Sequence, residues 1–264
     1  MRVTYRERVC MKPIEIKGMQ LGAGRPKVII SLMHEYVQDS LCTIEKGLAV
    51  GVDCFEWRGD FCLNVHDPEK MIEEGKQIAA ALPHNPLLFT FRSESQGGHL
   101  TLPVSEYVAL NKALIQAGIL DLVDIETWIG DSAVLELVAC AKEHGVKTVI
   151  SYHNFQGTPS KEWMVNLMTH MQDLGADIPK IAVMAKESRD ALELLAATEE
   201  MARLHAQGPL LTMAMGGVGS ITRLTGELFG SALTFCALEA SSAPGQVSVS
   251  QALQIMDSLH EVVS

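Results

Sequence analysis

Lys180 is the residue whose position in the sequence most clearly suggests chemistry. It stands immediately before the apolar run 181–184, and we expect a strand to begin beside it. Apolar surroundings disfavour the ammonium form, which lowers the pKa of a lysine and makes its amine a nucleophile. Such an amine can attack a ketone and form a Schiff base. The alternative is a lysine at the mouth of a strand whose ammonium group reaches water, and Lys180 alone does not decide between the two.

Other polar residues follow the apolar segments that we expect to be strands. His153 could move protons near neutral pH, although a lone histidine can also be structural. Arg58, Arg92 and Arg223 would repel one another at one site unless carboxylates or an anionic ligand compensate. Glu56 lies two residues before Arg58, so the two share a strand face and could simply form an ion pair. Together with Lys180, these residues predict a site for an anionic, polyhydroxylated ketone.

The elements that must position these residues are short apolar segments that alternate with amphipathic ones. Most of the apolar segments lack strict alternation, as expected of strands buried on both faces. The predicted strands are 28–32, 54–57, 87–91, 122–126, 148–151, 181–184, 211–215 and 233–237, and helical patterns include 68–82, 104–117, 132–143, 160–174 and 188–205. This order predicts an α/β fold, a single (β/α)8 barrel over residues 1–264, with its site at the carboxyl ends of the strands.

Two further features bear on the fold. An open doubly wound sheet is the alternative, but the glycines of 216–219 lack the spacing of a dinucleotide-binding loop. Residues 1–24 precede the first barrel strand, and we expect them to form a hairpin that closes the barrel floor.

Composition excludes several classes of protein. A formal net charge of −11 argues against a nucleic-acid partner. The six cysteines show neither C-x-x-C pairs nor zinc-like spacing, which predicts reduced thiols, no metal site and a cytoplasmic protein. We also expect no signal peptide and no membrane partner, because no apolar run approaches the length that such segments need.

Six motifs occur in order along nearly the whole chain. They are GRPKVIISLM (24–33), FEWR (55–58), PLLFTFRS (86–93), IPKIA (178–182), RLTGELFGS (223–231) and SAPGQ (242–246). These motifs resemble type I 3-dehydroquinate dehydratase, a lyase of the shikimate pathway, which leads to chorismate and the aromatic amino acids. The resemblance implies cofactor-free dehydration of 3-dehydroquinate to 3-dehydroshikimate by a homodimer.

The resemblance also implies a role for each candidate residue. Lys180 forms the Schiff base with the C3 ketone, and His153 moves the protons of a syn elimination. Arg223 holds the substrate carboxylate with a bidentate fork. The remaining implied contacts are Glu56, Arg58 and Arg92 to ring hydroxyls, Ser242 and Gln246 on a lid loop, and Ser31, Met213 and Met215 in the pocket wall. For the two methionines, plain filling of the core is an equal alternative.

The chain departs from the family pattern at position 96. Gln96 stands where the family usually has a glutamate that orients the catalytic histidine. We expect Gln96 to hydrogen-bond the imidazole without stabilising its charge, so that the pKa of His153 is lower than in relatives with glutamate. Glu94 could supply the missing charge, and Asn154 replaces a frequent aspartate. The role of Asp60 stays open, and so does that of Glu126, which could brace its neighbours.

Two other functions remain open at this point. A class I aldolase acting on a sugar phosphate would share the lysine, but the SAPGQ and FEWR motifs favour the dehydratase. A metabolite-binding paralogue without turnover is the second alternative, for which Gln96 is the one supporting feature. The sequence does not distinguish a biosynthetic role from quinate catabolism.

Overall fold

Eight parallel strands form one sheet in the computed structural model, which describes residues 11–239 and 241–263. Their order around the sheet is β10-β3-β4-β5-β6-β7-β8-β9. The strands are β3 (Lys27–Leu32), β4 (Cys54–Arg58), β5 (Leu87–Thr90), β6 (Leu122–Glu126), β7 (Lys147–Asn154), β8 (Ile178–Met184), β9 (Leu211–Met215) and β10 (Leu233–Phe235). A bridge between Leu210 and Ser231 joins the residues just before β9 and β10, so the barrel is nearly closed. The predicted (β/α)8 barrel is confirmed.

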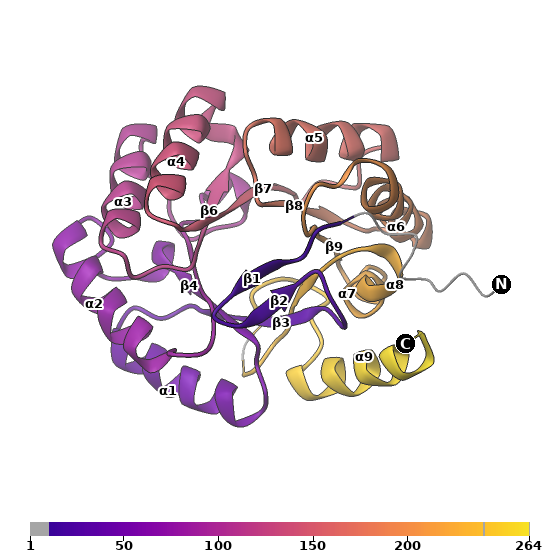
Figure 1. Cartoon of the computed structure of the whole chain (residues 1–264), viewed down its shortest axis with the longest axis horizontal. Helices are drawn as coiled ribbons and strands as arrows, with labels where there is room; N and C mark the ends of the chain where they lie inside the picture. The colour runs from indigo at the N-terminus through magenta and orange to yellow at the C-terminus, as the bar shows by residue number, and fades with distance from the viewer. Residues whose placement is uncertain (1–10, 240, 264) are drawn as a thin grey trace.

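Helices surround the sheet, as Figure 1 shows. They are α1 (Val37–Ala49), α2 (Pro68–Ala81), α3 (Val104–Gln116), α4 (Asp131–Glu143), α5 (Lys161–Asp173), α6 (Ser188–Glu200), α7 (Ser220–Leu224), α8 (Gly226–Phe229) and α9 (Val249–Val263). Side-chain caps fix two of the starts: Asp67 accepts a hydrogen bond from the Lys70 N–H, and Ser160 accepts one from the Trp163 N–H. The helix predicted at 188–205 is α6 followed by a π-helical turn, Met201–His205.

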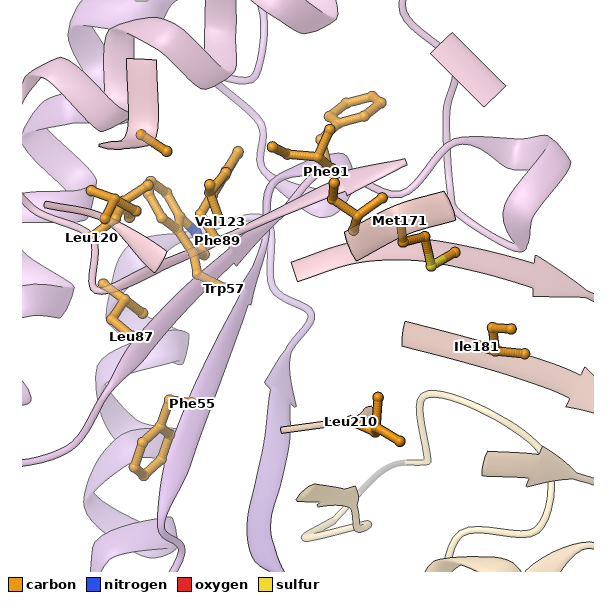
Figure 2. Packing of buried hydrophobic residues seen from close by; sticks show 14 of the residues in the cluster. Phe55, Trp57, Leu87, Phe89, Phe91, Leu120, Val123, Met171, Ile181 and Leu210 are labelled. Atoms are coloured by element: carbon orange, nitrogen blue, oxygen red, sulfur yellow. The ribbon is translucent and has the colours of Figure 1, made fainter. Parts of the chain in front are cut away.

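The larger core lies between the barrel strands and the helices. Trp57 and Phe89, on adjacent strands, make an edge-to-face contact with ring centroids 5.2 Å apart, and Figure 2 shows them among the other buried side chains. Gly75 of α2 lets this helix approach closely, because a Cβ there would lie 2.9 Å from the Trp57 ring. This layer fixes the strands from outside, and the interior of the barrel is left to a second cluster.

The second cluster closes the barrel floor. An antiparallel hairpin of β1 (Ile14–Ile16) and β2 (Met19–Leu21) crosses the barrel strands in Figure 1. Ile16 and Leu21 are buried in one cluster with the residues that begin several strands, among them Leu122 and Ile178. The predicted floor hairpin is therefore confirmed for the described residues, and residues 1–10 lie outside them.

Two of the differences from the predicted strand boundaries bear on the site. The strand that we expected from residue 181 begins at Ile178, so Lys180 is its third residue. Pro179 cannot donate a hydrogen bond, yet it pairs in register with Ile150 within the sheet. Strand β7 continues to Asn154, which places His153 within the strand.

Two further expectations concern reduced cysteine thiols and membrane-spanning helices. Cys42, Cys54, Cys62, Cys140 and Cys236, the cysteines of the described ranges, are free. Of the helices in the same ranges, none combines the length and the apolarity that a membrane crossing needs.

Candidate active site

A pocket opens at the carboxyl ends of the strands. Eleven of the predicted site residues line it: Glu56, Arg58, Arg92, Gln96, His153, Lys180, Met213, Met215, Arg223, Ser242 and Gln246. Its wall also contains five residues that we did not predict: Gly97, Phe155, Ala182, Phe235 and Ala243. Ser31 and Glu126, which were also predicted, are not among the residues that line it.

Lys180 is buried among charges rather than among apolar residues alone. Only 2% of the residue is exposed, and its Nζ lies 2.9 Å from Asp124 Oδ2 and 3.8 Å from Glu56 Oε1. The ring of Phe235 is the apolar neighbour, with its centroid 4.8 Å from Nζ. The apolar surroundings predicted for Lys180 are therefore wrong in one respect, since two carboxylates accompany the amine.

Asp124 is the principal residue that the sequence analysis missed. Its Oδ2 also lies 2.7 Å from Arg92 Nη2, and its Oδ1 accepts a 2.6 Å hydrogen bond from Ser151 Oγ. Burial opposes ionisation, but the charges of Arg92 and Lys180 outweigh it and lower the pKa of Asp124 to about 2. A usable signal was its spacing from Glu126, because residues two apart on a strand share a face.

Arg58 is paired with Asp60, and the ion pair that we considered between Glu56 and Arg58 is wrong. Asp60 accepts hydrogen bonds from Arg58 Nε at 2.8 Å and from Nη2 at 2.7 Å. The same carboxylate accepts the backbone N–H groups of Arg92 and His99. Asp60 thus ties Arg58 to the loop that follows β5.

Glu56 is held by hydroxyl groups. Thr90 Oγ1 donates to its Oε1 at 2.8 Å, and Ser31 Oγ donates to its Oε2 at 2.6 Å. Ser31 also lies 3.3 Å from Ser242 Oγ. Ser31 is not among the residues that line this pocket, but it lines a neighbouring one together with Ser242, and its contact with a ligand stays a prediction.

Arg92 is anchored by a second carboxylate, Glu126. Its Nη1 lies 2.7 Å from Glu126 Oε1, and Trp128 Nε1 donates to Glu126 Oε2 at 2.6 Å. Burial opposes the charge of Arg92, but the nearby carboxylates prevail and raise its pKa. Glu126 therefore holds Arg92 and Trp128 in place by hydrogen bonds, which is the supporting role suggested for it from the sequence.

Arg223 has no carboxylate partner within the described ranges. The residue is 1% exposed, its Nη1 lies 3.5 Å from Met213 Sδ, and its Nη2 lies 3.4 Å from the Pro244 carbonyl oxygen. Burial lowers the pKa of its guanidinium to about 10. A buried cation without a counter-ion that faces a pocket is suited to an anionic ligand.

His153 and Gln96 contact one another through the backbone. Gln96 Oε1 accepts a 2.7 Å hydrogen bond from the His153 backbone N–H, so the contact predicted with the imidazole is wrong. The ring Nδ1 is buried and has no hydrogen-bond partner among the described residues. Burial, followed by the charges of Arg92, Lys180 and Arg58, holds the pKa of His153 well below its ordinary value.

The Gln96 loop contains no replacement charge. Glu94 is exposed and accepts a hydrogen bond from Thr101 Oγ1, so the suggestion that it supplies the charge missing at Gln96 is wrong. The loop is tightly packed instead, because a Cβ on Gly98 would lie 1.7 Å from the Arg92 carbonyl oxygen.

The loop 241–247 lies against the pocket. Gln246 Oε1 accepts from the Ser242 backbone N–H at 2.9 Å, and its Nε2 donates to Ser242 Oγ at 2.7 Å. The Pro244 carbonyl accepts a 3.1 Å hydrogen bond from the Gly216 N–H, which holds the loop against the end of β9.

The fold and the pocket together define a barrel enzyme with a charged site for a small molecule. Residues 28–262 match the family described as type I 3-dehydroquinase. The 3-dehydroquinate dehydratase of Shigella boydii serotype 4 is 42% identical over 251 residues, which are 95% of this chain and 100% of that protein. The chain belongs to the type I 3-dehydroquinase family.

Solved structures agree with this assignment. A type I 3-dehydroquinate dehydratase from Clostridium difficile with covalently modified comenic acid is 40% identical, with a TM-score of 0.91 over 96% of this chain and 99% of that one. The 3-dehydroquinate dehydratase of Geobacillus kaustophilus is 37% identical, with a TM-score of 0.91 over 95% of this chain and 97% of that one.

Proposed function

We propose that this enzyme dehydrates 3-dehydroquinate to 3-dehydroshikimate through a Schiff base on Lys180. Membership of the family and the names of its relatives support the reaction. The observation that carries the mechanism is that Lys180 and the carboxylate-free Arg223 line one pocket. A ligand with a ketone and a carboxylate can engage both groups at once. A site that only binds a ligand would not need the lysine, and a structural arginine would be expected to have a carboxylate partner.

Binding in this proposal uses the charges of the pocket in two ways. Arg223 receives the substrate carboxylate in a bidentate pair, which gives the buried guanidinium its counter-ion. Glu56, Arg58 and Arg92 bind the ring hydroxyls, because their own partners leave some donors and acceptors free. Met213 and Met215 pack on the ring, and the loop with Ser242 and Gln246 excludes water from above.

Formation of the imine begins with a proton transfer. The lowered pKa of His153 leaves a neutral imidazole, which takes a proton from the Lys180 ammonium. The freed amine attacks C3, and one of its two protons passes from nitrogen to the carbonyl oxygen to give a neutral carbinolamine. The imidazolium then protonates the C3 hydroxyl, water leaves, and the nitrogen becomes a cationic iminium.

The iminium makes the elimination accessible. His153, neutral again, removes a proton from C2, and the electron pair moves towards nitrogen to form an enamine. The enamine expels the C1 hydroxyl, which takes the proton from the imidazolium and leaves as water. Both transfers use one histidine, so proton and hydroxyl leave from the same face. Water then hydrolyses the conjugated iminium and releases the product and Lys180.

The proposal is tested by mixing the purified protein with 3-dehydroquinate and following the ultraviolet absorbance of the conjugated enone. The same mixture is treated with borohydride and digested for mass spectrometry. We expect turnover in the wild type and a reduced adduct on Lys180. The Lys180→Met variant should form neither, whereas Lys186→Met, a change in the exposed segment after β8, should retain both. Turnover without a lysine adduct would refute the Schiff base, and an adduct without turnover would indicate a non-catalytic paralogue.

We also propose that residues 1–264 form one catalytic domain that acts as a homodimer in the cytoplasm, without a cofactor. The family resemblance and the barrel support these points. Sedimentation velocity at micromolar concentration tests the dimer, and a monomeric profile with full activity would contradict it.

A further inference from the structure

Asp124 has no part in the proton transfers described above, although it is the acidic group nearest to the reacting nitrogen. Its Oδ2 is 2.9 Å from Lys180 Nζ, whereas Glu56 Oε1 is 3.8 Å away. The residue is fully buried on β6, so water does not screen this interaction.

The position of this carboxylate is fixed from two further sides. Ser151 Oγ donates to Oδ1 at 2.6 Å, and Arg92 Nη2 lies 2.7 Å from Oδ2. Arg92 is held in turn by Glu126. The charge of Asp124 therefore stays in one place while the nitrogen changes its bonding.

The nitrogen of Lys180 changes charge several times in the proposed cycle. It is cationic as an ammonium and as an iminium, and it is neutral as an amine and as an enamine. A fixed anion at 2.9 Å favours the two cationic forms and disfavours the two neutral ones. The iminium withdraws electrons from C2 only while it carries its proton, so the protonated imine is the form that the reaction needs.

We propose that Asp124 is the counter-ion of the Lys180 nitrogen and keeps the imine protonated during catalysis. The proposal rests on the Schiff-base function above. Asp124 takes up no proton: the ammonium proton goes to His153, and the positive charge returns to nitrogen when water leaves the carbinolamine. Glu56 is the more distant anion, and its hydrogen bonds from Ser31 and Thr90 suit it to ligand hydroxyls.

The experiment measures trapping by cyanoborohydride, which reduces the cationic iminium and not the neutral imine. We compare the rate constant for adduct formation on Lys180 in the wild type and in Asp124→Asn between about pH 6 and pH 9. Removing the negative charge lowers the pKa of the iminium. We therefore expect the wild-type rate constant to stay level, and that of the variant to fall about tenfold as the pH rises through this range. At neutral pH the kcat of the variant should fall about a hundredfold, with a smaller change in KM.

Asp53→Asn is the matched control. Asp53 also pairs with an arginine, Arg25, and its side chain is 16% exposed, but it lies beside the start of β3 and does not line the pocket. A merely structural effect of losing a carboxylate that pairs with an arginine would alter both variants alike, whereas the proposal predicts a wild-type trapping profile for Asp53→Asn. Identical pH profiles of trapping for Asp124→Asn and the wild type would refute the counter-ion role of Asp124.

Two further cases are decided by trapping experiments on the wild type alone. If Asp124→Asn does not fold, a level wild-type profile supports the proposal, and a fall above neutral pH overturns it. If the wild type forms no adduct with either borohydride reagent, the Schiff base itself is refuted, and the counter-ion with it.

Discussion

Replacing Arg223 by methionine should stabilise the protein and disable it at the same time. Methionine is shorter than arginine but keeps the unbranched apolar stem of this side chain, which lies against Met213. It removes a guanidinium that is 1% exposed and lacks a carboxylate partner in the described part of the chain. The two effects have opposite signs because the charge is unfavourable in the empty pocket and favourable once a carboxylate binds.

The stability effect follows from the pKa of the guanidinium. Burial lowers this pKa from the ordinary arginine value to about 10, which corresponds to about 3 kcal/mol at neutral pH. The folded pKa of this cation lies below the unfolded one, so the charge destabilises the fold fully below about pH 10, and the penalty disappears as the pH rises further. We expect Arg223→Met to recover up to about 3 kcal/mol, or a Tm higher by up to about 10 °C.

The activity effect follows from the lost ion pair with the substrate. Truncating one partner of a buried charge pair costs about 3 kcal/mol or more, so kcat/KM should fall at least about a hundredfold. Steady-state kinetics and calorimetry of the unliganded enzyme measure the two effects on one preparation.

Arg203→Met is the control for the loss of an arginine. Arg203 is 45% exposed and pairs with Glu199 on the same helical segment, so its replacement should change the free energy of unfolding by less than about 0.5 kcal/mol. A Tm for Arg223→Met below that of this control would refute the burial penalty. A kcat/KM within tenfold of the wild type would refute the role of Arg223 in binding the carboxylate.

Three further predictions concern the Gln96 loop and its neighbours. Gln96→Glu places a negative charge beside His153 and raises its pKa, so the acid limb of the pH–rate profile, where rate falls as the base is protonated, should move to higher pH; an unchanged profile would contradict this. Gly98→Ala should cost about 3 kcal/mol of unfolding free energy by denaturant titration, since its Cβ meets the Arg92 carbonyl, whereas Gly157→Ala, with open space around it, should cost much less; equal losses would refute the packing argument. Asp60→Asn should raise KM about tenfold, because Arg58 loses its counter-ion, and an unchanged KM would exclude Asp60 as its anchor.

The elements of the barrel could be predicted because each carries a strong local signal. Buried strands such as β5 are short, mostly apolar runs, and helix starts such as those at Asp67 and Ser160 have capping side chains. The start of β8 was less accessible, because Pro179 resembles a strand terminator unless the register of its neighbour is known. A local pattern cannot provide that register, since it depends on a strand about thirty residues away.

The residues of the pocket were easier to predict than their partners. Lys180 of β8, His153 of β7 and Arg223 of α7 line one pocket, as expected from the barrel topology. A shared strand face, however, suggested that Arg58 pairs with Glu56, whereas it pairs with Asp60, which the short helical turn Gly59–Phe61 brings back towards it. The same limit applies to Gln96, whose amide contacts a backbone group that no motif describes.

The pattern of ion pairs determines how a ligand can be oriented in the pocket. Arg58, Arg92 and Lys180 each have a carboxylate within 3 Å, namely Asp60, Glu126 and Asp124 respectively. Of the charged residues that line the pocket, Arg223 and Glu56 are left without an oppositely charged group within 3 Å. Glu56 already accepts hydrogen bonds from two hydroxyl groups. An anionic ligand that also carries hydroxyl donors can therefore satisfy both ends in one orientation, with its carboxylate on Arg223 and a hydroxyl on Glu56. A sugar phosphate could bind Arg223 as well, but the two negative charges of its phosphate would then face a single cation that has no carboxylate partner. The charge balance thus favours a monocarboxylate, as the dehydratase reaction requires.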